Sequence, residues 1–338
     1  MRIKKTCLFP FGLYCLFALV LLAACSAEPL LVFRGQTMGT FYTVKIAGKT
    51  DPHKQAEIPN TIDSVLTAVN SSLNRYDKNS EIAAFNCYRG QDPFLVSAAF
   101  MEVTRTADQI YRGSGTAFDP TISPLVRLWG FGDDGAVEAP HPDTLAAALQ
   151  HVGFNKLKIH GNALQKSDPF LELDYSAIAK GYGVDRLTEA LQRRGYENVL
   201  VEIGGELRVL GRREGKAWRV AVASPESFKA YSAVISLNNK ACATSGDYRQ
   251  YYLLEGKRYS HLIDPGTGHP IEHELTSVSV IADNCMLADA VATAAIVMGK
   301  EKGMAFVESL QGVEAYFIYH DGTALQSIHS SGWRDFLP

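Results

Sequence analysis

The spacing of apolar residues separates a mainly helical first part of the chain from a strand-rich second part, and this restricts the fold more than any other feature. In the first 195 residues, apolar side chains recur mainly every three or four positions, which predicts helices. We expect these helices over residues 60–73, 96–111, 143–150 and 176–194. From residue 199 to about 282, short alternating segments predict strands, and 284–298 returns to a helix. This segregation predicts an α+β fold with mixed, largely antiparallel sheets in two interleaved lobes.

Irregular segments complete this prediction. Residues 32–46 are typical of a strand broken by Gly35 and Gly39, and the polar segment 49–59 with its two prolines predicts a loop. Residues 154–173 contain short strand pieces, and the Gly- and Pro-rich segment 113–135 predicts a structured loop. The strands that we expect in the second half are 199–203, 207–210, 218–222, 233–237, 251–254, 277–281 and 315–319, with a hairpin at Glu255-Gly256-Lys257.

The first two dozen residues do not belong to this fold. Three basic residues precede the apolar run from Leu8 to Leu22, and Leu22-Ala23-Ala24-Cys25 follows, which resembles a bacterial lipobox. We therefore expect a signal peptide over 1–24, a tether over 25–31 lipidated at Cys25, and one folded domain over 32–338. The protein would then be anchored in a bacterial cell membrane facing the periplasm, with inner or outer membrane left open. The alternative is a transmembrane anchor, but the run is shorter than the ~20 residues of a span.

Composition excludes several classes of protein. The chain has 338 residues, 46% of them hydrophobic, which is enough for a sizeable core. Cleavage before Cys25 would leave 30 basic against 36 acidic residues, a charge of −6, which argues against a nucleic-acid partner. The cysteines that remain in the body, Cys87, Cys242 and Cys285, are widely spaced and odd in number. They predict no zinc site or redox dithiol and leave one disulfide open.

A carboxylate and a hydroxyl four residues apart form the first candidate site. On a helix, Asp289 and Thr293 lie on one face, separated only by alanine and valine. Their hard oxygen atoms suit magnesium or calcium and do not suit zinc. The alternative is that Asp289 stabilises the helix start and that Thr293 is a spacer.

A second candidate begins where a predicted strand ends at Asp174 and a helix starts near Ser176. The free N–H groups of a helix N-terminus attract phosphate, and Lys180 adds a positive charge. The alternative is a packed helix start that Ser176 caps. His261, in the third stretch, lies near the end of a strand-like segment, where a general base is often found, although a lone histidine is more often structural. Residues 117–132 and 243–249, the latter a glycine turn with polar side chains, are weaker candidates.

Together these stretches resemble one known family. The motifs, in chain order, are Met38-Gly39-Thr40, Tyr76 with Asn79-Ser80-Glu81-Ile82, Phe118-Asp119-Pro120-Thr121, Leu173-Asp174 to Gly181-Tyr182, Glu202-Ile203-Gly204-Gly205-Glu206-Leu207, Thr244 to Arg249, His261 to Pro270 and Ala288 to Thr293. This ordered series, over residues 32–335, resembles the ApbE family of bacterial lipoprotein FAD:protein FMN transferases. One departure is Tyr175, where many relatives carry a smaller residue, and we expect it to be harmless.

The resemblance implies a reaction and its partners. With magnesium, the family attaches the FMN part of FAD through a phosphoester to a Thr or Ser hydroxyl of a target protein, and AMP is released. The implied targets are exported flavoprotein subunits of sodium-pumping NADH:quinone reductase or Rnf-type complexes. The sequence itself names neither the target nor its acceptor residue, and it leaves the native divalent ion and the oligomeric state open.

The resemblance also implies roles for individual residues. His261 matches the base that acts on the acceptor hydroxyl. Asp289, Thr293 and the backbone carbonyl of Ala177 (or that of Ala292) match metal ligands. The positions that match contacts with FAD are Met38, Tyr76, Ala117, Phe118, Asp119, Asp174, Lys180 and Ile263. Two alternatives remain: an FAD pyrophosphatase that gives FMN and AMP, and a periplasmic flavin-binding lipoprotein without catalysis.

Overall fold

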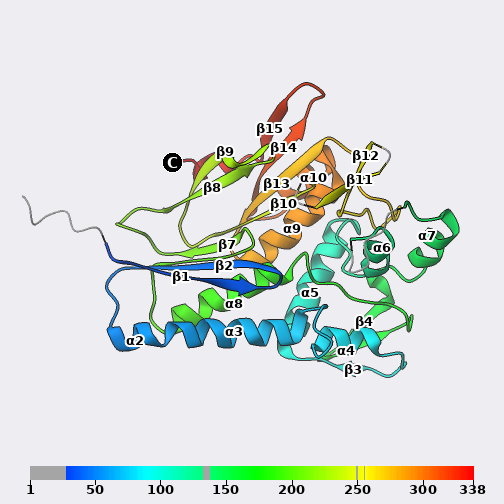
Figure 1. Ribbon diagram of the computed structural model, residues 1–338, viewed down its shortest axis with the longest axis horizontal. Helices are drawn as coiled ribbons and strands as arrows, with labels where there is room; N and C mark the ends of the chain where they lie inside the picture. The colour runs from blue at the N-terminus through cyan, green and yellow to red at the C-terminus, as the bar shows by residue number, and fades with distance from the viewer. Residues whose placement is uncertain (1–27, 132–137, 249, 255) are drawn as a thin grey trace, which may run out of the picture.

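An eight-stranded sheet in which every pairing is antiparallel organises the chain (Figure 1). The computed structural model describes residues 28–131, 138–248, 250–254 and 256–338, so Cys25 and the 1–24 segment lie outside the described residues. The strands, in their order across the sheet, are β1 (Leu30–Thr37), β2 (Thr40–Ala47), β6 (Val199–Ile203), β7 (Glu206–Leu210), β10 (Ala241–Gly246), β13 (Leu275–Ala282), β14 (Glu314–His320) and β15 (Leu325–His329).

The central strands are apolar on both faces because both faces of the sheet are covered. In β6, Val199 and Val201 pack toward the helices α3 (Ile58–Leu73) and α8 (Ala179–Arg193), whereas Leu200 belongs to the cluster on the opposite face. That opposite face is covered by the ribbon of β8 (Trp218–Ser224) and β9 (Ser227–Leu237). Helix α9 (Cys285–Met298) packs against β10 and β13 on the helical side. Strands buried on two faces are nearly continuous apolar runs rather than alternating ones.

A second, more helical lobe lies beside this sheet (Figure 1). It shares one apolar core with α9, in which Phe100 and Tyr175 pack with Val291. Its small sheet and its hairpin are also antiparallel. The elements of this lobe are α4 (Glu81–Cys87), β3 (Phe94–Leu95), α5 (Ala98–Gly113), α6 (Ser123–Leu128), α7 (Pro142–Leu149), a short 3-10 turn (Phe154–Lys156), β4 (Leu157–His160), β5 (Ala163–Lys166), β11 (Tyr251–Leu254) and β12 (Lys257–Ser260). The prediction of an α+β fold with largely antiparallel sheets is confirmed.

The helices predicted from periodicity are present as α3, α5, α7, α8 and α9. The helices α4, α6 and α10 (Lys300–Glu308) were not predicted, and α6 lies in the segment 113–135 expected to be a loop. The segment 49–59, expected to be a loop, contains α2 (Pro52–Ala56), because the Asp51 side chain accepts the N–H of His53 and a proline occupies the first turn. The expected break at Gly35 is also wrong, since Gly35 pairs with Tyr42 inside the hairpin, and only the turn at Gly39 interrupts the strand. The chain ends in β15 and a 3-10 turn (Trp333–Phe336).

Two further expectations are corrected near the candidate site. No strand ends at Asp174, because the backbone N–H and C=O of Leu173 bond to the side-chain amide of Asn86 instead of to a neighbouring strand. Helix α8 begins at Ala179 rather than near Ser176, since the Ser176 N–H donates to the Asp174 carboxylate. Cys87, Cys242 and Cys285 are free thiols. Among the described residues, no helix combines the length and the apolar character needed to cross a membrane.

Candidate active site

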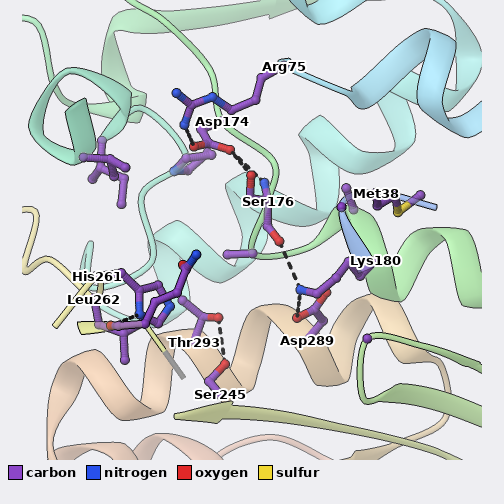
Figure 2. Close-up of a pocket in the computed structure, with 18 of the residues that line it drawn as sticks. Met38, Arg75, Asp174, Ser176, Lys180, Ser245, His261, Leu262, Asp289 and Thr293 are labelled. Atoms are coloured by element: carbon purple, nitrogen blue, oxygen red, sulfur yellow. Dashed lines mark hydrogen bonds and ion pairs between the residues drawn. The ribbon is translucent and has the colours of Figure 1, made fainter. Parts of the chain in front are cut away.

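A cavity of about 630 Å³ lies between the two lobes, and every residue that we assigned a role in the body of the fold lines it (Figure 2). Those residues are Met38, Tyr76, Ala117, Phe118, Asp119, Asp174, Ala177, Lys180, His261, Ile263, Asp289 and Thr293. They come from the β1–β2 turn, the end of α3, the loop before α6, the start of α8, the segment after β12, and α9. The structure therefore brings these residues together, while the individual roles remain predictions.

The close approach of α8 to α9 holds Asp289 at the cavity wall. A Cβ atom added to Gly181 would lie 2.4 Å from the backbone oxygen of Cys285, so only glycine permits this distance between the helices. The Gly181 N–H donates to Oδ2 of Asp289 at 3.0 Å, and Asp289 is 3% exposed. The missing side chain of Gly181 thus lets one helix approach the other.

The register of this contact is fixed one turn further along α8. The buried carboxylate of Asp185 accepts the N–H groups of Cys285 and Met286, the first residues of α9. Burial raises the pKa of Asp185, although these bonds and Arg208 at 2.9 Å oppose the shift. A carboxylate at the positive end of a helix stabilises that helix. Asp185 thereby sets the position of α9, which carries Asp289 and Thr293.

Lys180 lies among three oxygen atoms at the cavity wall. Its Nζ is 3.4 Å from Oε1 of Glu206 and 4.0 Å from Oδ1 of Asp289, and it donates to the Ser176 carbonyl at 3.3 Å (Figure 2). Glu206 is 2% exposed. The ammonium group is therefore held at the start of α8, next to the carboxylate predicted to bind metal.

Thr293 is oriented by a strand that we interpreted as a turn. Residues 243–249 were expected to form a polar turn, but Ala241–Gly246 is the central strand β10. Its small side chains suit a position buried on both sides, where Ser245 faces α9. The Ser245 hydroxyl lies 3.0 Å from Oγ1 of Thr293 and hydrogen-bonds to it (Figure 2).

The donors gathered here fit a magnesium ion. Asp289 supplies a carboxylate and Thr293 a hydroxyl, and no backbone amide of the described residues donates to the carbonyl of Ala177. No group of three or more His, Cys, Asp or Glu side chains suited to a metal occurs in the described part of the chain. Mg²⁺ requires no such cluster, because it usually keeps several waters and binds one or two carboxylates plus substrate phosphates.

The charge of the cavity wall also fits a divalent cation. The charged residues that line the cavity are Arg75, Lys180, Asp119, Asp174, Glu206 and Asp289, a formal charge of −2. A pyrophosphate group would be repelled by that charge at short range. A bound Mg²⁺ would cancel it.

Asp174 is held by an arginine that sequence reasoning missed. Arg75 lies 2.5 Å from Oδ2 of Asp174, and both side chains are about nine-tenths buried. Oδ1 of Asp174 accepts the N–H of Ser176 at 2.9 Å, which shapes the turn before α8. The Arg75 guanidinium also lies 4.9 Å from the ring centre of Tyr76, which is 58% exposed. This pair links the end of α3 to the start of α8 across the cavity.

Asp119 supports the loop before α6. Its Oδ1 accepts from the Thr121 N–H and hydroxyl at 2.8 and 2.6 Å, and its Oδ2 accepts from the Phe154 N–H at 3.2 Å. Burial raises the pKa of Asp119, and these hydrogen bonds oppose the shift. Phe118 is 3% exposed and belongs to the shared core. The carboxylate is thus occupied by the loop itself, and its contact with FAD stays a prediction.

The orientation of His261 suits a base. Its backbone N–H donates to the carbonyl of Gln250 at 3.2 Å, and its Nδ1 lies 3.1 Å from the same oxygen. A carbonyl oxygen only accepts, so Nδ1 carries the hydrogen and Nε2 is the unprotonated nitrogen when the ring is neutral. Phe131 packs against the ring with centroids 6.3 Å apart. Ile263, which also lines the cavity, is 1% exposed.

The structure adds residues for which sequence reasoning assigned no role. Arg75 and Gln250 gave no sequence signal, since each is recognised only by a partner from another part of the chain. Glu206 and Ser245 lay inside quoted motifs, and for Glu206 the available sign was an acidic residue directly after Gly204 and Gly205. Tyr175 is fully buried with its hydroxyl 2.7 Å from that of Thr104, away from the cavity.

Comparisons with known proteins agree with this geometry. The sequence model of the ApbE family matches residues 38–317 of this chain. The FAD:protein FMN transferase of Vibrio cholerae is 39% identical over 329 residues, which cover 96% of this chain and 98% of that protein. The solved structure of the flavin transferase ApbE from Vibrio cholerae superposes with a TM-score of 0.85 at 38% identity, over 92% of this chain and all of that one. The apo flavinyl transferase ApbE of Pseudomonas stutzeri gives 0.84 at 34% identity, over 92% and 98%. The chain belongs to the ApbE family.

Proposed function

We propose that this protein is a magnesium-dependent FAD:protein FMN transferase. It moves the FMN part of FAD onto a Thr or Ser hydroxyl of a target flavoprotein and releases AMP. The observation that carries the proposal is the meeting, in one cavity of an ApbE-family chain, of His261 with the Asp289 and Thr293 pair. A passive flavin-binding protein has no need of that pair.

The residues that would hold Mg²⁺ are Asp289, Thr293 and the carbonyl of Ala177. When bound, the ion would act as a Lewis acid on the pyrophosphate and stabilise the negative charge that develops on the AMP leaving group. Lys180 adds positive potential at the same wall, held there by Glu206 and Asp289. Ser245 orients the Thr293 hydroxyl through its 3.0 Å hydrogen bond.

His261 would activate the acceptor. Its Nε2 takes the proton of the Thr or Ser hydroxyl as the oxygen attacks the phosphorus atom on the FMN side. The new P–O bond forms as the bond to the AMP phosphate oxygen breaks, and AMP leaves with that electron pair. The Gln250 carbonyl, which fixes the hydrogen on Nδ1, stabilises the ring once both nitrogens carry hydrogen.

Mass spectrometry of the acceptor tests the function directly. The protein is mixed with FAD, Mg²⁺ and a fragment of an exported flavoprotein subunit that carries the acceptor residue. Added FMN mass on the fragment supports transferase activity. Free FMN and AMP with an unmodified fragment would mean that water is the acceptor and the chain is an FAD pyrophosphatase. Unchanged FAD would mean a binding protein.

Two variants assign the residues. Asp289→Ala should abolish metal-dependent transfer and weaken Mn²⁺ binding measured by calorimetry, and undiminished transfer would remove the metal role. His261→Ala should lose transfer by about 10²–10⁴-fold while FAD affinity stays unchanged. If His261→Ala transfers FMN at the wild-type rate, His261 is not the base.

We extend the proposal to the location and targets of the enzyme. Cys25 is the lipidation site, the 1–24 segment is removed as a signal peptide, and the catalytic domain faces the periplasm. Its targets are exported subunits of sodium-pumping NADH:quinone reductase or Rnf-type complexes. Metabolic labelling with an alkyne analogue of palmitate should label the wild-type protein, and Cys25→Ala should remove the label. Equal labelling of both would place the lipid elsewhere.

A further inference from the structure

The β11–β12 hairpin begins and ends at the predicted base. The Gln250 carbonyl precedes β11, His261 follows β12, and both residues line the cavity. The two are joined by the hydrogen bonds from the His261 N–H and Nδ1 to the Gln250 oxygen. A group bound along this hairpin would therefore lie next to the predicted base, His261.

One face of the hairpin is fixed to the body of the protein. The rings of Tyr252 and Tyr259 stack on each other with centroids 5.5 Å apart. Tyr252 lies 5.2 Å from the ring of Phe131, and Tyr259 lies 5.4 Å from that of Trp129 at the end of α6. These contacts place the hairpin beside α6, as Figure 1 shows. A short two-stranded ribbon is marginally stable alone, and this aromatic packing stabilises it.

The opposite face of β11 exposes large apolar side chains. Tyr251 is 50% exposed and Leu253 is 67% exposed, on the same side of one strand. Arg258 lies over the Tyr251 ring at 4.3 Å and forms an ion pair with Asp247 at 3.1 Å. The exposed surface thus consists of the side chains of Tyr251 and Leu253, next to Arg258, which Asp247 holds in place.

The outer edge of β11 also carries main-chain groups that point away from β12. Leu254 and Lys257 are register partners beside a two-residue loop, and His261 bonds to Gln250 at the other end of the ribbon. In an antiparallel ladder, residue pairs that exchange backbone hydrogen bonds alternate with pairs that do not. Tyr251 and Leu253 therefore belong to the pairs that exchange no hydrogen bonds with β12. Their N–H and C=O groups face outward and have no backbone partner among the described residues.

We propose that this edge of β11, with Tyr251 and Leu253, is the docking site for the acceptor segment of the target protein. The segment adds to the hairpin as a further strand and brings its hydroxyl to Nε2 of His261. The proposal rests on the proposed function, because only an acceptor that is itself a polypeptide has a backbone to pair with a strand edge. Leu253 and Gln250 are three residues apart, roughly 10 Å along the strand, so an extended segment of about five residues spans the edge and reaches the base.

This mode of binding suits an enzyme that must recognise a segment by its backbone. Main-chain pairing gives affinity that does not depend on most side chains, whereas Tyr251 and Leu253 give modest selectivity. An acceptor hydroxyl within a packed helix could not pair in this way. The occupant is therefore an extended or loop segment of the flavoprotein.

Leu253→Pro tests the edge with little other change. Proline removes the outward N–H of residue 253, and proline is tolerated in edge strands where the N–H faces solvent. Transfer of FMN to the flavoprotein fragment is measured against fragment concentration. We expect the KM for the fragment to rise at least tenfold, with kcat and the FAD Kd within twofold of wild type. The variant Tyr251→Ser with Leu253→Ser, which keeps both N–H groups, should raise the KM about threefold to tenfold, and it decides the matter if Leu253→Pro fails to fold.

The matched control is Leu95→Ser on β3, because Leu95 is 71% exposed and does not line the cavity. It should leave the KM unchanged. A wild-type KM in both β11 variants, while wild-type enzyme transfers FMN, would overturn the docking site alone. Absence of transfer by the wild-type enzyme would instead overturn the proposed function and the docking site with it. If sedimentation shows a dimer that Leu253→Pro dissociates without a change in KM, the edge is a subunit interface and the proposal is wrong.

Discussion

Replacing Gly181 with alanine would force α8 and α9 apart at the point where Asp289 is held. The new Cβ would lie 2.4 Å from the oxygen and 2.7 Å from the carbon of the Cys285 carbonyl, and 2.8 Å from Cα of Met286. Ordinary contact begins near 3.4 Å, so backbone atoms must move by about 1 Å. These are main-chain atoms at the start of α9, where Asp185 also binds, and no side-chain rotation relieves the clash.

The expected loss of stability follows from three contributions. Overpacking of this kind costs roughly 1–3 kcal/mol. Weakening the N–H bond from Gly181 to the Asp289 carboxylate costs about 1–2 kcal/mol more. Alanine returns up to about 1 kcal/mol through its helix propensity. We therefore expect Gly181→Ala to lower the free energy of unfolding by about 1–5 kcal/mol. The Mn²⁺ affinity should fall at least tenfold because Asp289 moves with α9.

The neighbouring glycine provides a matched control. A Cβ on Gly183 would meet the terminal methyl group of Met38 at 2.9 Å, and that flexible side chain is able to move aside. Gly183→Ala should thus be neutral or up to about 1 kcal/mol more stable, with Mn²⁺ affinity within twofold of wild type. Urea titration followed by tryptophan fluorescence and calorimetry with Mn²⁺ measure the two effects. Equal urea midpoints and equal metal affinities for the two variants would refute the reasoning.

Three other changes have defined outcomes. Thr104→Val should lower the free energy of unfolding by about 1–3 kcal/mol in urea titration, because it leaves the buried Tyr175 hydroxyl unpaired. Adding Tyr175→Phe should restore most of that stability, and no restoration would show that the hydrogen bond between the two hydroxyls is unimportant. Burial lowers the pKa of Lys166 from its ordinary 10.5 to about 8, so the folded state gives up a proton that the unfolded chain keeps and stability rises between pH 8 and 10.5. Lys166→Met should remove about 1–2 kcal/mol of that rise in melts across this range, and an identical pH profile would contradict the shift. Ser245→Ala should weaken Mn²⁺ binding about tenfold through Thr293, with Ser245→Thr closer to wild type, whereas unchanged calorimetry would exclude an orienting role.

The sequence predicts those parts of the fold whose pattern is local. Helices α3 and α5 have strongly amphipathic faces, and the small apolar residues of α9 indicate a buried helix. Strand β10 escaped prediction because its small, polar-ended Ala-Cys-Ala-Thr-Ser-Gly sequence lacks the bulky β-branched residues typical of strands. Its strand state comes from its neighbours β7 and β13, which a single segment does not reveal. The absence of a strand ending at Asp174 likewise depends on Asn86, distant in sequence.

The candidate site was predictable to a similar extent. A series of motifs shared with a family points to residues such as His261 and Asp289, and the structure brings them into one cavity. Their partners depend on tertiary contacts. Arg75 meets Asp174 across 99 residues of sequence, and Ser245 meets Thr293 across 48. No spacing rule connects such pairs, because nothing local fixes their approach.

The order of strands in the large sheet has a consequence for how the enzyme comes into being. Strand β2 pairs with β6, whereas α9, which comes much later in the chain, packs against β10 and β13 and against α5 of the second lobe. A polypeptide growing from its N-terminus thus holds Met38 and Asp119 long before it holds Asp289 and Thr293. Contacts between residues so far apart close late, since long loops are entropically costly to join. A fragment that ends before α9 therefore lacks the part of the cavity wall that carries Asp289 and Thr293.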